Sequence, residues 1–306
     1  MMLAALTLAA SIVVGTGRAE AGYSRGGAFT TPGYGARAWG MGGAATLTVE
    51  DEGAVFWNPA MMGRFQARNL VGASYVNLVA GATARQSQLA YGRTLEAGTP
   101  GEGRKPFARH AVGALYTNVH FDIQGDVGYD EHTFRLAYAF TPDPFISFGI
   151  AGDLLISRSD VPDFDALGSS VDFALRAELL DGLSLGLVAR NAFSQYRFNY
   201  GDQIVREREF VLAVATDALP VVTAEGDIVW AHHDVARLTL GAETDYLFDR
   251  LALRAGLGLV RIGESRSVPY AGFGFRAGAV TLHYNANFDQ ETALSDTHRF
   301  SVSVRL

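Results

Sequence analysis

The sequence predicts an all-β fold: a transmembrane antiparallel up-and-down β-barrel of about 14 strands, preceded by a short N-terminal plug with one helical turn or two. Three observations predict it. Apolar and polar side chains alternate with a period of two from about residue 68 to residue 306. The alternating runs are about 9 to 12 residues long, as a tilted strand needs to cross a bilayer, whereas soluble strands usually end after about 5 or 6 residues. Very short connections also alternate along the chain with longer ones.

The first 21 residues have the pattern of a secretory signal peptide. An apolar run from Leu3 to Gly15 is too short to span a membrane as a helix, and it leads to the small-residue pattern Ala19-Glu20-Ala21. We therefore expect cleavage after Ala21 and export of the chain. The positive charge that usually precedes such a run is missing, so a buried N-terminal helix is the alternative interpretation. Because no later stretch approaches 18 consecutive apolar residues, we expect no transmembrane helix.

Composition excludes several classes of protein. The chain has 306 residues, a formal net charge of -7 and a pI near 5.5, which argue against nucleic-acid binding because that function needs a concentrated basic face. It has no cysteine, so it forms no disulfide bond and no thiolate metal site.

The two faces of each run differ in chemistry. In the run 169–180, Phe173 and Leu175 share one face and Asp172 and Arg176 share the other. A hydrated lumen accepts charges in mid-strand, while an aliphatic and aromatic face suits lipid. The expected strands are 69–79, 84–95, 107–121, 131–141, 145–157, 169–180, 183–193, 205–217, 220–231, 235–247, 249–261, 269–276, 279–288 and 297–306.

The charges that we assign to the lumen face have both signs. The main ones are Arg135, Arg176, Glu178 and Arg254, and the same faces carry Arg190, Glu225, Asp227, Arg237, Glu243, Asp245 and Arg299. Mixed signs predict a network of paired charges that holds the plug and the wall together. An ion-selective pore would present rings of one sign instead.

The connections define the two ends of the barrel. The short ones are Pro142-Asp143-Pro144, Asp181-Gly182, Ala218-Leu219, Phe248 and Gly278, and the longer ones are 122–131, 157–168, 194–204, 261–269 and 289–296. Two connections break the rule, a long one at 96–106 and a short one at 232–234. Short turns on one side and longer loops on the other are typical of bacterial outer-membrane barrels. An even number of strands places both chain ends at the periplasmic side.

The chain ends within an alternating strand. Phe300, Val302, Val304 and Leu306 share the expected lipid face. Because hydrocarbon tolerates no open sheet edge, this strand must pair with the first one. It also resembles the signal by which the outer-membrane assembly machinery recognises its clients, although the usual last residue is Phe and here it is Leu306.

Residues 22–67 do not alternate and are expected to form the plug. Asp51 predicts the N-cap of a short helix, and Pro59 ends that helix at Asn58 because the residue before a proline avoids the helical region. The cluster Gly40-Met41-Gly42-Gly43 allows tight turns or close backbone approach. Trp57 and the preceding Phe56 have no strand partner and should be buried. The segment packs in the lumen or over the periplasmic mouth, where Arg135, Arg176 and Arg254 are expected partners for Glu50, Asp51 and Glu52.

The same segment resembles a known family. Gly35 to Ala44, the acidic Glu50-Asp51, and Phe56-Trp57-Asn58-Pro59-Ala60 are similar to the opening of the PorV/PorQ family, which belongs with the FadL-type outer-membrane barrels. Members share this opening before about 14 strands and usually have a second acid at the position of Glu52. Where they usually have Gly-Leu, this chain has Met61-Met62. The resemblance implies that the opening segment is an N-terminal hatch.

Other candidate sites are better explained as structural, so we predict no enzyme activity, no metal and no cofactor. His232-His233-Asp234 resembles the acids and histidines of outer-membrane proteases, but adjacent residues on a tight turn point apart. His283 and Asn285 lack a suitably spaced serine. The acidic loop with Asp160, Asp163 and Asp165 lacks the glycine and final glutamate of a calcium loop. The glycine cluster lacks the lysine of a phosphate loop.

Two functional hypotheses remain. The first, favoured by the opening motif, is a PorV/PorQ-type protein of the outer membrane that acts in secretion or handles surface proteins through its outer loops. The alternative is a FadL-like transporter of hydrophobic small molecules such as fatty acids and aromatic hydrocarbons, whose ligand enters from outside, shifts the plug, and leaves through the wall or the lumen. Other expected partners are outer-membrane lipid, lipopolysaccharide and the barrel assembly machinery.

Overall fold

The computed structural model describes residues 33–77, 84–96, 109–123, 127–160, 165–199, 201, 203–219, 221–231, 234–245, 247–260, 266–288 and 297–306. The expected signal peptide at 1–21, the connections around 97–108 and 289–296, the histidines at 232–233, and Asp163 lie outside these residues.

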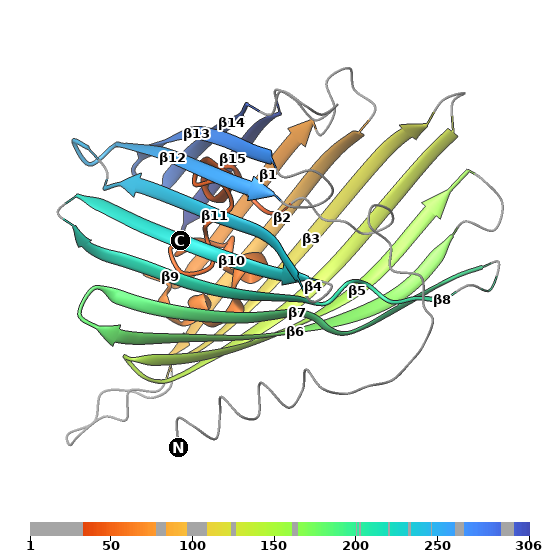
Figure 1. Ribbon diagram of the computed structural model, residues 1–306, viewed down its shortest axis with the longest axis horizontal. Helices are drawn as coiled ribbons and strands as arrows, with labels where there is room; N and C mark the ends of the chain where they lie inside the picture. Colours follow the sequence, from red (N-terminus) through yellow and green to blue (C-terminus); the bar gives the residue numbers. More distant parts are fainter. Residues whose placement is uncertain are drawn as a thin grey trace.

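The described strands form one antiparallel sheet that closes on itself as a transmembrane barrel (Figure 1). They are β1 (Asn69–Asn77), β2 (Ala84–Glu96), β3 (Arg109–Ile123), β4 (Val127–Asp143), β5 (Ile146–Ser159), β6 (Ala166–Leu180), β7 (Leu183–Phe198), β8 (Gln203–Ile204), β9 (Glu209–Leu219), β10 (Val222–Ala231), β11 (Asp234–Thr244), β12 (Leu251–Val260), β13 (Arg266–Ala277), β14 (Val280–Asn287) and β15 (His298–Arg305). Fourteen of these strands close the barrel, and the two-residue β8 pairs only with β7.

The closing contact joins the first and last strands. β1 pairs with β15 from Leu70↔Arg305 to Val76↔Arg299. Below this ladder, the backbones of Asn69 and Leu306 exchange two hydrogen bonds, of 3.1 and 2.9 Å. The last residue therefore belongs to the barrel wall, as the need for a closed edge predicts.

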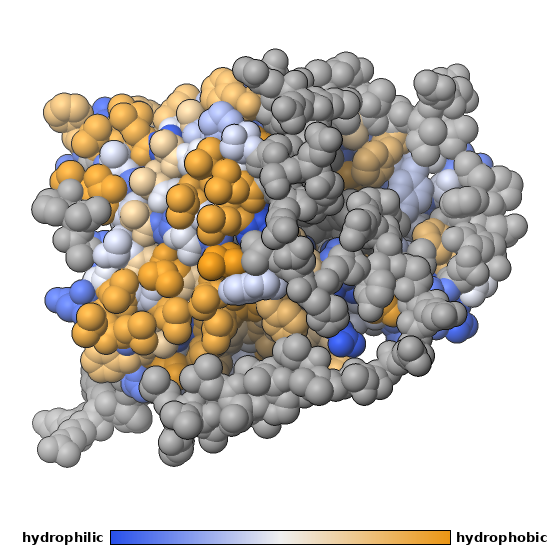
Figure 2. All heavy atoms as spheres, viewed as in Figure 1, coloured by the Kyte–Doolittle hydropathy of each residue, from blue (hydrophilic) through white to orange (hydrophobic). Residues whose placement is uncertain are grey.

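Each strand exposes apolar side chains outward and places polar ones inward. Outward positions include Leu136, Phe148 and Leu282, which are 71%, 45% and 53% exposed. On the face seen in Figure 2, apolar side chains gather over the part of the barrel with the short turns. Arg135, Arg176 and Arg254 are buried on the inner side of the wall. Among the described residues, no helix has the length and apolar character needed to cross a membrane.

The barrel is taller on one side than on the other. β3 to β7 have 14 to 17 residues each, whereas β14 and β15 have 8. The expected long loops 122–131, 157–168 and 194–204 are therefore partly strand, and the residues of the expected loop 261–269 from Arg266 onward belong to β13. The lipid-face pattern missed the extensions of β4, β5 and β7 because their outward positions, such as Asp130, Arg158 and Arg197, are polar. Similarly, Ala218-Leu219 belong to β9, and Val221, just before β10, has φ 59°.

The plug lies inside the barrel, between the inner faces of the strands (Figure 1). Its described part contains α2 (Ala36–Gly40), α3 (Ala54–Trp57) and the 3₁₀-helix η1 (Pro59–Arg64). Its apolar side chains form the centre of the main hydrophobic cluster, with small wall residues such as Ala90, Ala111 and Ala213 around them. Small inward residues on the wall leave the volume that the plug fills.

Candidate functional site

The glycine cluster of the plug packs backbone to backbone against the wall. Gly42 and Gly43 have φ of 71° and 82°, a conformation that residues with a Cβ rarely adopt. Facing them, Gly241 of β11 and Gly256 of β12 form a cross-strand pair. A Cβ at Gly256 would lie 2.1 Å from the Gly42 nitrogen, and one at Gly241 would lie 2.4 Å from the Met41 oxygen. The cluster thus supplies both tight turns and close approach, and two wall glycines make the approach possible.

The segment from Asp51 to Pro59 forms the expected short helix, but it begins later than predicted. The N-cap of α3 is Gly53 and not Asp51, because the Asp51 carboxylate accepts the Gly53 N–H at 2.9 Å in the turn before the helix. Asn58 is extended, with φ −157° and ψ 99°, as a residue before proline should be. Its buried amide donates to the Thr46 carbonyl at 2.8 Å and accepts from the Ala60 N–H at 3.0 Å. These bonds satisfy backbone groups that the turn leaves unpaired.

Three wall arginines cover the aromatic side chains of the plug. Trp57 is buried and donates its indole N–H to the Tyr34 carbonyl at 2.9 Å. The Arg190 guanidinium lies 5.6 Å from the Trp57 ring centre, and Arg299 lies 4.5 Å from that of Trp39. Arg135 lies 5.5 Å from the ring of Phe56. At these distances a cation is attracted to the face of an aromatic ring, so these arginines bind the plug without a counter-charge on it.

Arg135 also joins the wall to the end of helix α3. It donates to both carboxylate oxygens of Asp153, at 2.7 and 2.9 Å, and to Asp172. A third contact reaches the Phe56 carbonyl at 3.1 Å, one of the groups that the short helix leaves unpaired. Because its charge is balanced by two wall carboxylates, Arg135 holds the plug through a neutral acceptor.

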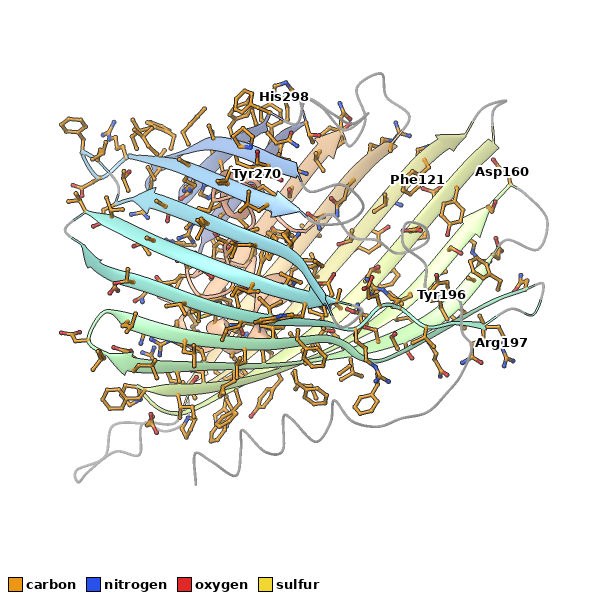
Figure 3. All side chains as sticks on the ribbon, viewed as in Figure 1. Phe121, Asp160, Tyr196, Arg197, Tyr270 and His298 are labelled. Carbon is orange, nitrogen blue, oxygen red and sulfur yellow. The ribbon has the colours of Figure 1, made fainter. Side chains whose placement is uncertain are left out.

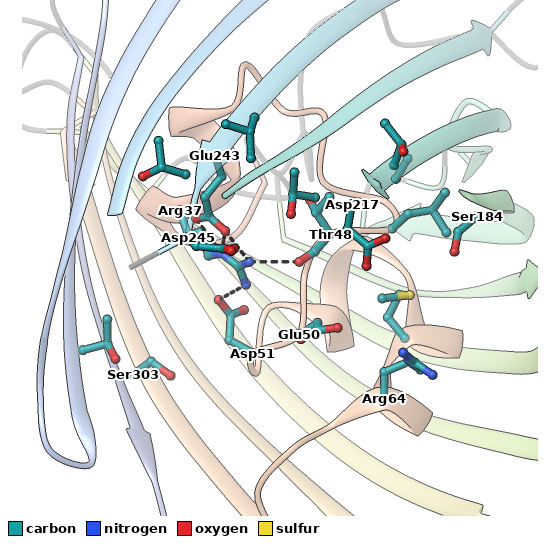
Figure 4. A pocket seen from close by; sticks show the side chains of 18 of the residues that line it. Arg37, Thr48, Glu50, Asp51, Arg64, Ser184, Asp217, Glu243, Asp245 and Ser303 are labelled. Atoms are coloured by element: carbon teal, nitrogen blue, oxygen red, sulfur yellow. Dashed lines mark hydrogen bonds and ion pairs between the residues drawn. The ribbon is translucent and has the colours of Figure 1, made fainter. Parts of the chain in front are cut away.

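The acids of the plug have other partners than the sequence suggested. Asp51 pairs with Arg37 of the plug itself at 3.2 Å, and Arg37 pairs with Glu243 of β11 at 2.7 Å (Figure 4). Arg254 bonds to the same Glu243. The expected pairing of the plug acids with Arg135, Arg176 and Arg254 was therefore wrong, because wall carboxylates occupy those arginines. Among them, Arg176 bonds to Glu178, Ser184 and the Pro144 carbonyl.

Glu52 lies buried at the seam where the barrel closes. Its carboxyl accepts hydrogen bonds from Ser303 of β15 at 2.6 Å and from Tyr34 at 3.1 Å. A Cβ at Gly72 of β1, the cross-strand partner of Ser303, would lie 1.8 Å from the carboxyl. Burial, and next the negative charge of Asp51, raise the pKa of Glu52 to about 8. Glu52 is therefore mostly protonated at neutral pH.

Two acidic side chains of β10 bind the plug, one through backbone N–H groups and one through a hydroxyl. Glu225 accepts the N–H groups of Leu47 and Thr48 at 2.7 and 2.9 Å, and Asp227 accepts the Thr46 hydroxyl at 2.7 Å. The sequence places both acids in the lumen, but it does not identify their hydrogen-bond donors, which lie about 180 positions earlier. The sequence contains one signal for these contacts. Glu225 and Asp227 share the inward face of one strand, and no arginine lies near them in sequence.

The lumen differs in character on the two sides of the plug. Toward the outer strand ends, inward side chains form two apolar clusters, one with Leu155, Tyr196 and Phe198, the other with Val119 beside Phe121. Phe121 and Tyr196 lie toward the end that carries β8 (Figure 3). At the short-turn end a polar cavity of about 460 Å³ remains, lined by charged and hydroxyl side chains including Glu50, Arg64, Ser184, Asp217 and Asp245 (Figure 4).

The wall is irregular next to the outer clusters. β7 shifts register against β6 between Val171 and Phe173, and Asn191 there has φ 51°. Above this point β7 no longer pairs with β9, whose ladder ends at Arg190↔Glu209. Side chains replace the missing ladder: Asn191 donates to the Glu207 carbonyl at 2.9 Å and Ser194 to the Arg206 carbonyl at 3.2 Å. Replacement of backbone ladders by side-chain bonds makes this the least regular part of the described wall.

The remaining candidate residues have structural contacts. Asn285 donates to the Ala271 carbonyl at 3.1 Å beside the buried His283. Asp160 accepts the Gly128 N–H at 2.7 Å, and Asp165 pairs with Arg158 at 2.7 Å. Across the described part of the chain, no three His, Cys, Asp or Glu side chains are placed to hold a metal ion.

These contacts define a class of protein, a transmembrane β-barrel whose lumen is occupied by its own N-terminal segment. No protein-family model and no curated protein sequence matches the chain. Among solved structures it is similar to the P. putida toluene transporter TodX, at 13% identity and a TM-score of 0.65, over 90% of this chain and 99% of that one. It is also similar to the CymD monoaromatic hydrocarbon channel, at 12% identity and a TM-score of 0.66, over 91% of this chain and 99% of that one. A Pseudomonas aeruginosa FadL homologue is similar at 12% identity and a TM-score of 0.55, over 90% of this chain and 99% of that one.

At such low identity, the likeness shows the fold alone, a 14-strand barrel like those of these three proteins. The narrower resemblance to the PorV/PorQ family stays a prediction from the opening motif.

Proposed function

We propose that this protein lies in the bacterial outer membrane and lets small hydrophobic molecules pass from outside, with the plug controlling passage. The observation that carries the proposal is the division of the lumen. Its outer part contains apolar and aromatic clusters, with Leu155, Tyr196 and Phe198 in one of them, while the cavity at the short-turn end is lined by charged and hydroxyl side chains. An apolar, aromatic surface binds molecules that water excludes, whereas a porin for polar solutes needs a hydrated path.

The fold neighbours support this proposal over secretion. Two of them are called a toluene transporter and a monoaromatic hydrocarbon channel. Sequence reasoning had ranked the PorV/PorQ-type role first and transport second, and the comparisons favour the second. The signal peptide at 1–21 and recognition of the C-terminal strand by the assembly machinery remain predictions.

The route in the proposal has two stages. A hydrophobic molecule first binds among the outer clusters. Displacement of the plug then opens either the polar lumen below or the irregular wall beside Asn191. The wall route suits an apolar ligand, because side-chain bonds such as Asn191 to Glu207 replace continuous backbone ladders there and the ligand need not enter the polar cavity.

Uptake by intact cells tests the proposal. Cells that lack their own hydrocarbon transporter are given radiolabelled toluene or a long-chain fatty acid, with and without the full-length protein. We expect faster uptake with the protein and a several-fold loss with Leu155→Gln, which places an amide in the outer cluster. Leu136→Ala, at an outward position of β4 that is 71% exposed, is the matched control. Equal uptake with and without the assembled protein would refute transport.

The secretion role predicts a different result. The opening motif at Gly35 to Ala60 supports it, and it requires a protein ligand at the outer loops. Affinity purification from native membranes followed by mass spectrometry separates the two roles. A stoichiometric secreted or surface protein that remains bound would favour the PorV/PorQ-type role, and hydrophobic small molecules alone would favour transport.

A further inference from the structure

A groove on the outer surface of the barrel lies across the outer ends of β5, β6, β7 and β8. It has a volume of about 360 Å³, and the side chains that matter are Leu154, Leu167, Ser169, Gln195, Arg197 and Gln203. The strand register brings these side chains together. One row across three strands contains Leu154, Ser169 and Gln195, and the next row contains Leu167, Arg197 and Gln203. Alternation directs all of these strand positions away from the lumen.

The groove crosses the upper border of the membrane-facing surface. At about 3.3 Å per residue and a strand tilt of about 40°, Leu154 lies roughly 20 Å above the short turns and Arg197 roughly 35 Å above them. The apolar band of such barrels is about 25 Å tall. Below the groove the outward residues are apolar, such as Ile150 and Phe173. The lower part of the groove therefore contacts acyl chains and the upper part contacts headgroups.

The side chains of the two parts match the membrane regions that they contact. Leu154, in the lower part, is 46% exposed and offers apolar contact, whereas Leu167, 60% exposed, lies opposite Arg197 in the upper part. The amides of Gln195 and Gln203 lie 3.3 Å apart, and each retains hydrogen-bonding atoms for a ligand. Arg197 is exposed and points outward at the outer end (Figure 3). Arg158 on β5 differs because its charge is balanced by Asp165 at 2.7 Å. Among the described residues no carboxylate pairs with Arg197.

We propose that this groove is a binding site for a phosphorylated glycolipid of the outer leaflet. The Arg197 guanidinium binds the phosphate, whose oxygens fit its planar fork of donors. The amides of Gln195 and Gln203 bind sugar hydroxyls, and an acyl chain lies against Leu154. This inference rests on the proposed outer-membrane location, but not on transport. The bound lipid would cover the barrel wall just above the irregular segment at Asn191.

Native mass spectrometry of the purified, delipidated full-length chain in detergent tests the site. The protein is titrated with diphosphorylated lipid A, with the same lipid after phosphate removal, and with phosphatidylglycerol. We expect the phosphorylated glycolipid to bind best and Arg197→Gln to weaken it at least tenfold, to the level of the dephosphorylated lipid. Arg158→Gln is the matched control and should change little. Leu154→Ser should weaken both forms of lipid A.

Three results would overturn the proposal. Equal binding of the two forms of lipid A would remove the role of the phosphate. Equal effects of Arg197→Gln and Arg158→Gln would indicate general attraction by surface charge. Equal binding of phosphatidylglycerol, with the same dependence on Arg197, would assign the groove to phospholipid. Because uptake is not measured, none of these results depends on whether the protein transports anything; heat-shifted gel migration confirms that each variant is an assembled barrel.

Discussion

Substitution of Gly256 by alanine should weaken the contact between plug and wall. Gly256 lies on β12 opposite the glycine cluster, and a Cβ there would lie 2.1 Å from the Gly42 nitrogen and 2.2 Å from the Met41 carbonyl carbon. Ordinary contact begins at 3.4 Å, so the plug backbone and the wall must separate by about 1.3 Å. Because the obstructing atoms are backbone, no side-chain rotation relieves the clash.

The expected free-energy cost of this substitution follows from the known cost of overpacking. Forcing one extra carbon into a filled interior costs about 1–3 kcal/mol. A cost of about 2 kcal/mol changes the equilibrium between bound and displaced plug roughly thirtyfold. We therefore expect frequent brief openings in planar-bilayer recordings, where the parent protein stays closed.

The control for this substitution is Gly152→Ala. Gly152 faces outward on β5, and nothing lies within 4 Å of the position of its Cβ. The control should match the parent in conductance and in heat-shifted gel migration. In a barrel without the plug, Gly256→Ala should have no effect on conductance. An assembled Gly256→Ala barrel as closed as the parent would refute the claim that this contact holds the plug.

Three further predictions concern the plug and the topology. The pKa of Glu52 is about 8 in the bound plug and near 4.5 when the side chain is exposed. Because the bound plug favours the protonated form, binding of the plug should weaken as the pH rises from 4.5 to 8 and should stay constant above pH 8. Open probability should rise over that range, and Glu52→Gln should abolish the rise; a parent recording that is flat with pH would contradict it. Trp57→Ala removes a buried ring, at a cost of about 3–5 kcal/mol, and should give flickering openings in bilayer recordings; a silent, assembled variant would count against it. An epitope inserted at Asp181-Gly182 should stay unlabelled on intact cells and one inserted at Asp163 should be labelled, whereas the reverse would invert the topology.

The sequence predicted the barrel closely because a strand in lipid must satisfy two strict conditions. Outward residues must be apolar, and short turns must alternate with longer connections, so most strand ends were placed within a few residues. Where the outward face becomes polar, as at Asp130 and Arg197, the first condition no longer applies, and the strand extensions there were missed. A period of two cannot separate an extended strand outside the membrane from a polar loop.

The plug was predictable as a segment but not in its contacts. Pro59 and the glycines act locally, so the extended Asn58 and the tight turns could be expected. The partners of the plug depend on which wall residues the barrel brings opposite it. Glu225 with the Leu47 N–H, and Gly256 with Gly42, meet only after closure of the barrel. The arginines expected to bind the plug acids had nearer carboxylates on neighbouring strands.

The conductance of a barrel without the plug tests the central claim most directly. Deletion of residues 22–62 should leave a barrel that assembles, since the strands pair with one another and not through the plug. Heat-shifted gel migration and a strand-dominated far-UV circular dichroism spectrum would confirm assembly. In planar bilayers the deletion should raise conductance from near zero to that of an open pore. An assembled deletion variant that stays closed would contradict the account, because the lumen would then be blocked by its own wall charges and not by the plug.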